Sequence, residues 1–159
     1  MTGTRQAVGL VVCVAICFAA AGLGSLFTRP AIESWYSLLR KPPWTPPNWV
    51  FGPVWSALYL CMAIAAWLVW RRAGLSGAKL PLALFAIQLV FNVTWSSIFF
   101  GLRMPGVAFV EIVFLWLFIL AATAAFWPFS RVAVWLMAPY LLWVTFAAAL
   151  NYEFWRLNR

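Results

Sequence analysis

Residues 106–127 read GVAFVEIVFLWLFILAATAAFW, a run in which Glu111 is the only charged side chain. An α-helix rises about 1.5 Å per residue, so about 20 apolar residues are enough to cross the hydrocarbon core of a bilayer. Soluble domains rarely carry an apolar run of this length. We therefore expect this segment to be a transmembrane helix and the rest of the chain to be organised around it.

Four more runs of similar length and character lie along the chain. Together with the quoted run they cover residues 8–27, 49–70, 80–100, 106–127 and 132–154. Hydrophobic residues make up 66% of the 159 residues and charged residues only 9%, which excludes an ordinary water-soluble enzyme. The sequence predicts a single all-α membrane domain, residues 1–159, with five spans.

The first run has a second interpretation, as a secretory signal cleaved after about Ala21. A signal normally has an apolar core of about 7 to 15 residues, which is shorter than this run. We therefore interpret residues 8–27 as a retained first span.

The connections predict how the spans are arranged. Three of them are short, so consecutive helices are expected to be antiparallel neighbours in a five-helix bundle. Prolines such as Pro30, Pro81 and Pro105 are expected to mark the breaks. The one long connection, residues 28–48, contains Trp35 and Tyr36 together with several prolines. This composition favours an ordered loop that covers one end of the bundle.

The charged residues and the missing residue types narrow the function further. The net charge is +8, but the lysines and arginines fall between the apolar runs, which is typical of membrane-surface anchors and requires no nucleic acid. The chain has no histidine and no aspartate, so histidine-based triads and usual haem or zinc ligand sets are excluded. Cys13, Cys17 and Cys61 lie inside apolar runs and are interpreted as buried thiols, so no metal site is expected.

Polar and aromatic residues recur at helical spacing in the half of the bilayer next to the long connection. The stripes are Phe51, Trp55 and Tyr59; Gln88, Asn92, Trp95, Ser96 and Phe99; and Pro139, Trp143, Ala147 and Asn151. Polar groups in hydrocarbon are costly unless they face the bundle interior, so these stripes are expected to point inward. They would line a cavity for a flat apolar ligand, or, alternatively, the rings fill the core and the amides only join helices.

Glu111 is the one carboxylate expected inside a span. Such a group needs a partner, for which Arg103 or an asparagine is available, or else it is protonated. A structural pairing is favoured over a proton-transfer role, because a lone carboxylate is weak evidence for a pump.

Several sequence motifs share their order and depth with one family of membrane proteins. They are WY at 35–36, KPPWTPP at 41–47, VFGPVW at 50–55, QLVFNVTWS at 88–96 and PYLLW at 139–143. In these motifs the chain resembles the TspO/MBR family, the translocator proteins also called peripheral-type benzodiazepine receptors or tryptophan-rich sensory proteins. The resemblance extends over nearly the whole chain.

The resemblance implies a receptor or carrier for porphyrins and other haem-type tetrapyrroles, and in some members for sterols, which acts in tetrapyrrole sensing or transport. It implies a five-helix bundle, commonly a homodimer, in a bacterial envelope membrane or, in a eukaryote, the mitochondrial outer membrane. No cofactor is implied beyond the ligand. The family's ligand-binding positions fall here on Tyr36, Pro46, Trp55, Tyr59, Asn92, Trp95, Trp143, Ala147 and Leu150.

Two other functions and one further motif stay open from the sequence. Some family members degrade porphyrin under light, and the tryptophans matching that activity are Trp55 and Trp143. A small proton-coupled exporter is the other function, with Glu111 as its titratable group. The family's sterol motif matches Leu150, Tyr152 and Arg156, a weak pattern, and simple interfacial anchoring is the favoured interpretation of Tyr152 and Arg156.

Overall fold

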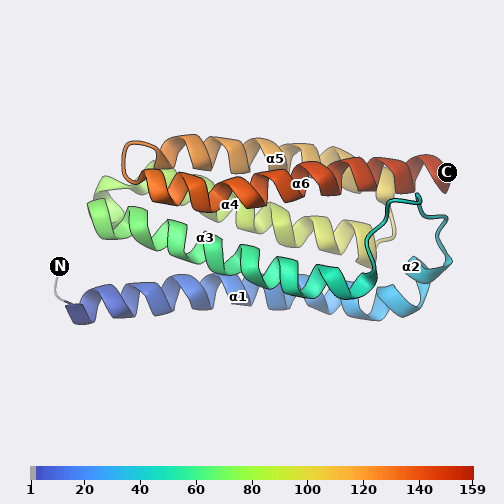
Figure 1. Cartoon of the computed structure of the whole chain (residues 1–159), viewed down its shortest axis with the longest axis horizontal. Helices are drawn as coiled ribbons and strands as arrows, with labels where there is room; N and C mark the ends of the chain where they lie inside the picture. The colour runs from blue at the N-terminus through green and yellow to red at the C-terminus, as the bar shows by residue number, and fades with distance from the viewer. Residues whose placement is uncertain (1–2) are drawn as a thin grey trace.

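The structure is a computed structural model that describes residues 3–159, and its long helices lie side by side along one axis (Figure 1). The elements in chain order are α1 (Gly3–Glu33), α2 (Trp35–Leu38), α3 (Asn48–Gly77), α4 (Lys79–Ser96), the π-helical turn η1 (Ser97–Gly101), α5 (Pro105–Phe126) and α6 (Arg131–Leu157). Helices α1, α3, α4 with η1, α5 and α6 are each long and apolar enough to cross a membrane. The predicted five-helix bundle is confirmed.

The packing of the helices follows from their short connections. Helix α3 contacts α1, α4 and α6, and α5 lies against α4 and α6. Figure 1 shows α2 and the C-terminal end of α6 at one end of the bundle, opposite the N-terminal end of α1. The core between the helices is apolar, and Met62, Val69, Ile119 and Met137 are completely buried in it.

The helix ends carry residue types that commonly begin, cap or end a helix. Pro105 is the first residue of α5, where its missing N–H costs nothing. The Ser130 side chain caps α6 by accepting a hydrogen bond from the backbone N–H of Ala133 at 3.2 Å. Gly74, near the end of α3, has a φ of 68°, in the left-handed region that favours glycine. This residue lets the chain turn within a short distance into α4.

Helix α1 does not end where the sequence predicted. Pro30 was expected to end the first span, but α1 continues through Pro30 to Glu33. A proline inside a helix costs about 3 kcal/mol, because it removes a backbone hydrogen bond and crowds the preceding turn. The extra turn buries Ala31 against the bundle, and this packing offsets part of that cost. The irregular part of the first connection is therefore only residues 39–47.

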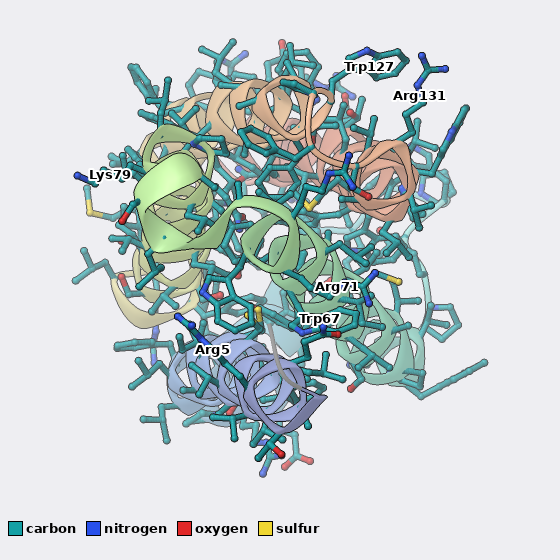
Figure 2. All side chains as sticks on the ribbon, turned by 90° about the vertical axis from the view of Figure 1, so that its left-hand side faces the viewer. Arg5, Trp67, Arg71, Lys79, Trp127 and Arg131 are labelled. Carbon is teal, nitrogen blue, oxygen red and sulfur yellow. The ribbon has the colours of Figure 1, made fainter. Side chains whose placement is uncertain are left out.

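The end of the bundle opposite α2 carries cations beside aromatic rings. Figure 2 looks onto this end, where Arg71 and Arg131 lie near Trp67 and Trp127. The guanidinium carbon of Arg71 is 4.7 Å from the ring centre of Trp67, and that of Arg131 is 5.0 Å from the ring centre of Trp127. Tryptophan and arginine at the ends of apolar helices are typical of the boundary between a membrane and water.

Candidate functional site

A cavity of about 590 Å³ lies among α1, α3, α4 and α6, in the half of the bundle next to α2. Pockets of about 300 to 1,000 Å³ are the usual size for small organic ligands. Aromatic rings supply much of the wall, among them Phe51, Trp55, Trp95, Phe99 and Trp143. The cavity therefore offers flat apolar surfaces contributed by three different helices.

The structure brings together nearly all of the residues predicted for the site. The predicted positions that line the cavity are Tyr36, Trp55, Tyr59, Asn92, Trp95, Trp143, Ala147 and Leu150. Pro46 is the exception, because it lies half-buried in the connection 39–47 and outside the lining. The inward orientation expected from helical spacing is present for Phe51, Trp55 and Tyr59, and for Trp143, Ala147 and Asn151. It is wrong for Pro139, which is exposed and outside the lining, because steps of four residues drift around a helix that has 3.6 residues per turn.

A chain of hydrogen bonds crosses the bundle at the floor of the cavity. The Tyr59 hydroxyl donates to the Asn92 side-chain oxygen. The Asn92 amide donates in turn to the Tyr140 hydroxyl at 2.8 Å, and that hydroxyl donates to the Gln88 oxygen at 2.8 Å. Gln88 is fully buried and is not among the lining residues. Of the two interpretations open for Gln88, the structure favours the one in which its amide joins helices.

Trp95 of α4 and Trp143 of α6 both line the cavity but differ in their polar contacts. The Trp95 indole N–H donates to the Asn151 oxygen at 2.9 Å, and the Asn151 amide donates to the Pro105 carbonyl at 2.7 Å. The Trp143 indole nitrogen is also buried, but it has no hydrogen-bond partner within residues 3–159. Trp95 is therefore held in place by a hydrogen bond, whereas Trp143 is held by ring packing against Phe51.

Tyr36 of α2 closes the cavity at the end where the first connection crosses the bundle. Its ring packs against Phe100 and Phe154, with ring centres 5.7 and 5.2 Å away. The Lys41 ammonium lies 4.2 Å from the centre of the same ring. Burial raises the pKa of Tyr36 to about 12, so its phenol is neutral at physiological pH. The contact with Lys41 is therefore a cation–π interaction.

The cavity opens on one side, between α1 and α3. The solvent-exposed lining residues all belong to these two helices: Phe18, Gly22, Arg29, Asn48, Trp49, Gly52 and Ser56. The lining residues of α4 and α6 are buried or half-buried. In a bilayer this opening would face the lipid and, near its α2 end, the headgroups.

The contribution of α1 to the cavity was missed in the sequence. The residues concerned include Phe18, Ser25, Arg29 and Ile32. The last three lie 7, 11 and 14 residues after Phe18, and this spacing places all four on one face of the helix. The spacing contains this signal, but residues 8–27 were interpreted only as a retained first span.

Glu111 is only 8% exposed on α5, and it does not line the cavity. The expected pairing is wrong: neither carboxyl oxygen has a hydrogen-bond partner within the described chain. Arg103 is in the connection before α5, which begins at Pro105, about 9 Å from Glu111 along the helix axis at 1.5 Å per residue. The arginine is exposed, and its φ of 58° is in the left-handed region.

The residues of the sterol motif do not share one surface. Leu150 is buried and lines the cavity, whereas Tyr152 is 41% exposed and packs against Phe109 with ring centres 5.3 Å apart. Arg156 is exposed and forms an ion pair with Glu153, with an N–O distance of 2.6 Å. Tyr152 and Arg156 therefore belong to the outer face of α6.

The described part of the chain contains no group of three or more His, Cys, Asp or Glu side chains that would hold a metal ion. All three cysteines are free, and Cys17 is completely buried in α1. The polar groups that line the cavity are indole, phenol, amide, hydroxyl and guanidinium groups.

Comparison with known proteins gives consistent matches along the chain. Residues 13–156 match the TspO/MBR family. The tryptophan-rich protein TspO of Chlorobaculum tepidum is 39% identical over 158 residues, which cover 97% of this chain and 98% of that protein. The tryptophan-rich sensory protein of Cereibacter sphaeroides is 41% identical, with 91% and 88% covered. The translocator protein of Ovis aries is 42% identical, with 86% and 82% covered.

Proposed function

This chain belongs to the TspO/MBR family and is a multi-pass integral membrane protein, and on that premise we propose that it is a membrane receptor or carrier for porphyrins and related flat apolar ligands. The proposal covers tetrapyrrole sensing or transport. The ligand would occupy the cavity among α1, α3, α4 and α6, beneath α2 and the connection 39–47.

One observation carries the proposal: indole and phenyl rings from separate helices converge on a single cavity of suitable size. Trp55 of α3 packs against Tyr59 with ring centres 5.7 Å apart, and Trp95 of α4 stacks on Phe99 at 5.1 Å. Trp143 of α6 lies edge-on to Phe51 at 6.0 Å. Rigid aromatic side chains bind flat ligands at a small cost in conformational entropy. Such walls fit a conjugated macrocycle better than a flexible lipid chain.

The polar groups at the cavity are few, and most are already hydrogen-bonded. The Tyr59 hydroxyl donates to the Asn92 oxygen, and the Asn92 amide donates to the Tyr140 hydroxyl. A ligand therefore gains little from hydrogen bonding at the floor and is held there by ring contacts. This arrangement supports a broad preference for flat apolar molecules, including sterols.

Intrinsic fluorescence tests the proposal directly. Protoporphyrin IX titrated into the protein in phosphatidylcholine nanodiscs is expected to quench tryptophan emission saturably, because cavity indoles lie in its binding site. Trp95→Phe and Trp143→Phe are each expected to reduce the saturable quenching. Trp135, which is 74% exposed at the far end of α6, supplies the control variant Trp135→Phe. Quenching that never saturates, or that Trp135→Phe alone removes, would contradict the proposal.

A second function, light-dependent porphyrin degradation, is favoured by the positions of Trp55 and Trp143. Both indoles line the cavity, one from α3 and one from α6. An indole beside a photoexcited tetrapyrrole can donate one electron to it, and dissolved dioxygen would serve as the oxidant. Illumination of the aerobic complex is expected to bleach the Soret band, and the double variant Trp55→Phe and Trp143→Phe is expected to stop this loss. Stable binding without bleaching would leave only the receptor or carrier function.

A proton-coupled exporter receives no comparable support. That mechanism requires a titratable carboxyl group at the substrate site, and Glu111 lies outside the cavity lining.

A further inference from the structure

Arg29 is the only charged side chain among the residues that line the cavity, within the part of the chain that the structure describes. It lies near the C-terminal end of α1, on the same helical face as Phe18, Ser25 and Ile32, which also line the cavity. Phe18 is about 16 Å from Arg29 along α1, at 1.5 Å per residue. The cavity therefore has an apolar interior and one cationic end.

The guanidinium of Arg29 has no acidic partner among the residues that the structure describes. The single salt bridge in residues 3–159 joins Glu153 to Arg156. Glu33 is one turn further along α1, but it does not come within 4.0 Å of Arg29 and is itself exposed. Arg29 is exposed at the mouth of the cavity with Asn48 and Trp49. Its hydrogen-bond donors are therefore available to a ligand that occupies the cavity.

The remaining polar lining groups are neutral, and those at the floor are already engaged. Tyr59 and Asn92 are hydrogen-bonded to each other, and Asn151 accepts from Trp95. A ligand with an anionic group would find its best electrostatic partner at the mouth. A guanidinium binds a carboxylate with two parallel hydrogen bonds, and such charge-assisted pairs are stronger than neutral ones.

We propose that Arg29 determines the specificity of the cavity by binding a carboxylate of the ligand, so that the site prefers flat macrocycles with an acidic edge over equally flat neutral molecules. This inference rests on the proposed binding of porphyrin-like ligands in the same cavity. The macrocycle lies between the aromatic walls, and its acidic edge points to the α2 end of the opening between α1 and α3. A neutral sterol makes the ring contacts and lacks the contact with Arg29.

The test compares protoporphyrin IX, which carries two carboxylates, with its dimethyl ester, which has the same macrocycle and no charge. Both are titrated against the wild type, Arg29→Gln and the control Arg103→Gln in nanodiscs of zwitterionic phosphatidylcholine. Arg103 is exposed in the connection between η1 and α5, at the same end of the bundle, and does not line the cavity. Because Arg29 is itself exposed, its replacement is not expected to disturb folding.

The wild type is expected to bind the diacid at least about tenfold more tightly than the diester, since a hydrogen bond to a charged group is worth about that much. Arg29→Gln is expected to remove this preference and leave the diester affinity unchanged, whereas Arg103→Gln preserves it. Equal wild-type affinities for diacid and diester, or an equal loss for both in Arg29→Gln, would overturn the role of Arg29 and leave the proposed function standing. Failure of the wild type to bind either compound saturably would overturn the proposed function as well.

Discussion

The Asn158 side chain, just beyond α6, forms two hydrogen bonds with the main chain of Arg40, a residue 118 positions earlier in the sequence. The Arg40 N–H donates to the Asn158 oxygen at 2.9 Å, and the Asn158 amide donates to the Arg40 carbonyl at 3.0 Å. The amide also donates to the Phe154 carbonyl at 2.9 Å. The connection that covers the cavity is thus fastened to the end of α6 through one side chain.

Asn158→Ala is expected to speed the release of a bound porphyrin about three- to tenfold. Each net hydrogen bond is worth roughly 1 kcal/mol, and exposure to water lowers that value here. Stopped-flow displacement, with recovery of tryptophan fluorescence, measures the rate. Asn158→Asp keeps the acceptor for the Arg40 N–H and should fall between Asn158→Ala and the wild type. Equal rates in all three proteins would show that the connection is held by other contacts.

Trp95→Phe is expected to destabilise the bundle more than Trp143→Phe, by about 1 kcal/mol. The first change removes the hydrogen bond to Asn151 between two helices, and such bonds are worth about 0.6 to 1.7 kcal/mol within membranes. The second change removes an indole N–H that has no partner among residues 3–159, so only ring packing is lost. Unfolding by SDS in mixed micelles gives the two free energies. The opposite order would mean that the Trp143 N–H finds a partner in the membrane.

Gly9→Ala is expected to destabilise the protein, whereas Gly22→Ala is expected to leave it unchanged or stabilise it. A Cβ on Gly9 would lie 2.1 Å from the Trp70 ring of α3, and one on Gly22 would meet nothing within 4 Å. Overpacking costs about 1 to 3 kcal/mol, against a gain in helix propensity of about 1 kcal/mol. Both glycines are in α1, so the gain in helix propensity is the same for the two substitutions. Thermal melting followed by circular dichroism is the measurement. Equal melting midpoints for Gly9→Ala and Gly22→Ala would contradict the close approach of Gly9 to the Trp70 ring.

Raising the pH from 10 to 12 is expected to destabilise the wild type more than Tyr36→Phe. Burial raises the pKa of Tyr36 from 10.0 to about 12, so the folded protein keeps this proton at a pH where the unfolded chain loses it. The stabilisation is fully present below pH 10 and is lost as the pH approaches 12. Subtracting the melting profile of Tyr36→Phe isolates this residue from the other tyrosines. Superimposable profiles of stability against pH for the wild type and Tyr36→Phe would contradict the raised pKa of Tyr36.

The sequence predicted the bundle and most of the cavity because both rest on repeated local patterns. Length and apolar content identify a membrane span, and the spacing of Gln88, Asn92 and Trp95 identifies the face that points inward. The spacing identifies the residues that share one face of a helix, but it does not show which of them reach the cavity surface. It therefore did not separate Asn92, which lines the cavity, from Gln88, which is buried behind it.

What the sequence missed depends on contacts between distant segments. The continuation of α1 through Pro30 breaks a local rule and is offset by the packing of Ala31, which no local pattern reveals. The position of Pro46 outside the lining depends on how the first connection folds over the bundle. Arg29 resembled an ordinary membrane anchor, and only the neighbouring α3 makes it part of the cavity mouth.

The one-sided opening between α1 and α3 changes what an affinity measurement reports. For a molecule that enters there from the acyl phase, occupancy follows its mole fraction among the lipids and not its total concentration in the buffer. Doubling the lipid at constant protein and ligand would dilute a strongly partitioning compound and raise its apparent dissociation constant by nearly the same factor. Dissociation constants measured for this protein are therefore comparable only when the ligand concentration is expressed as a mole fraction in the bilayer.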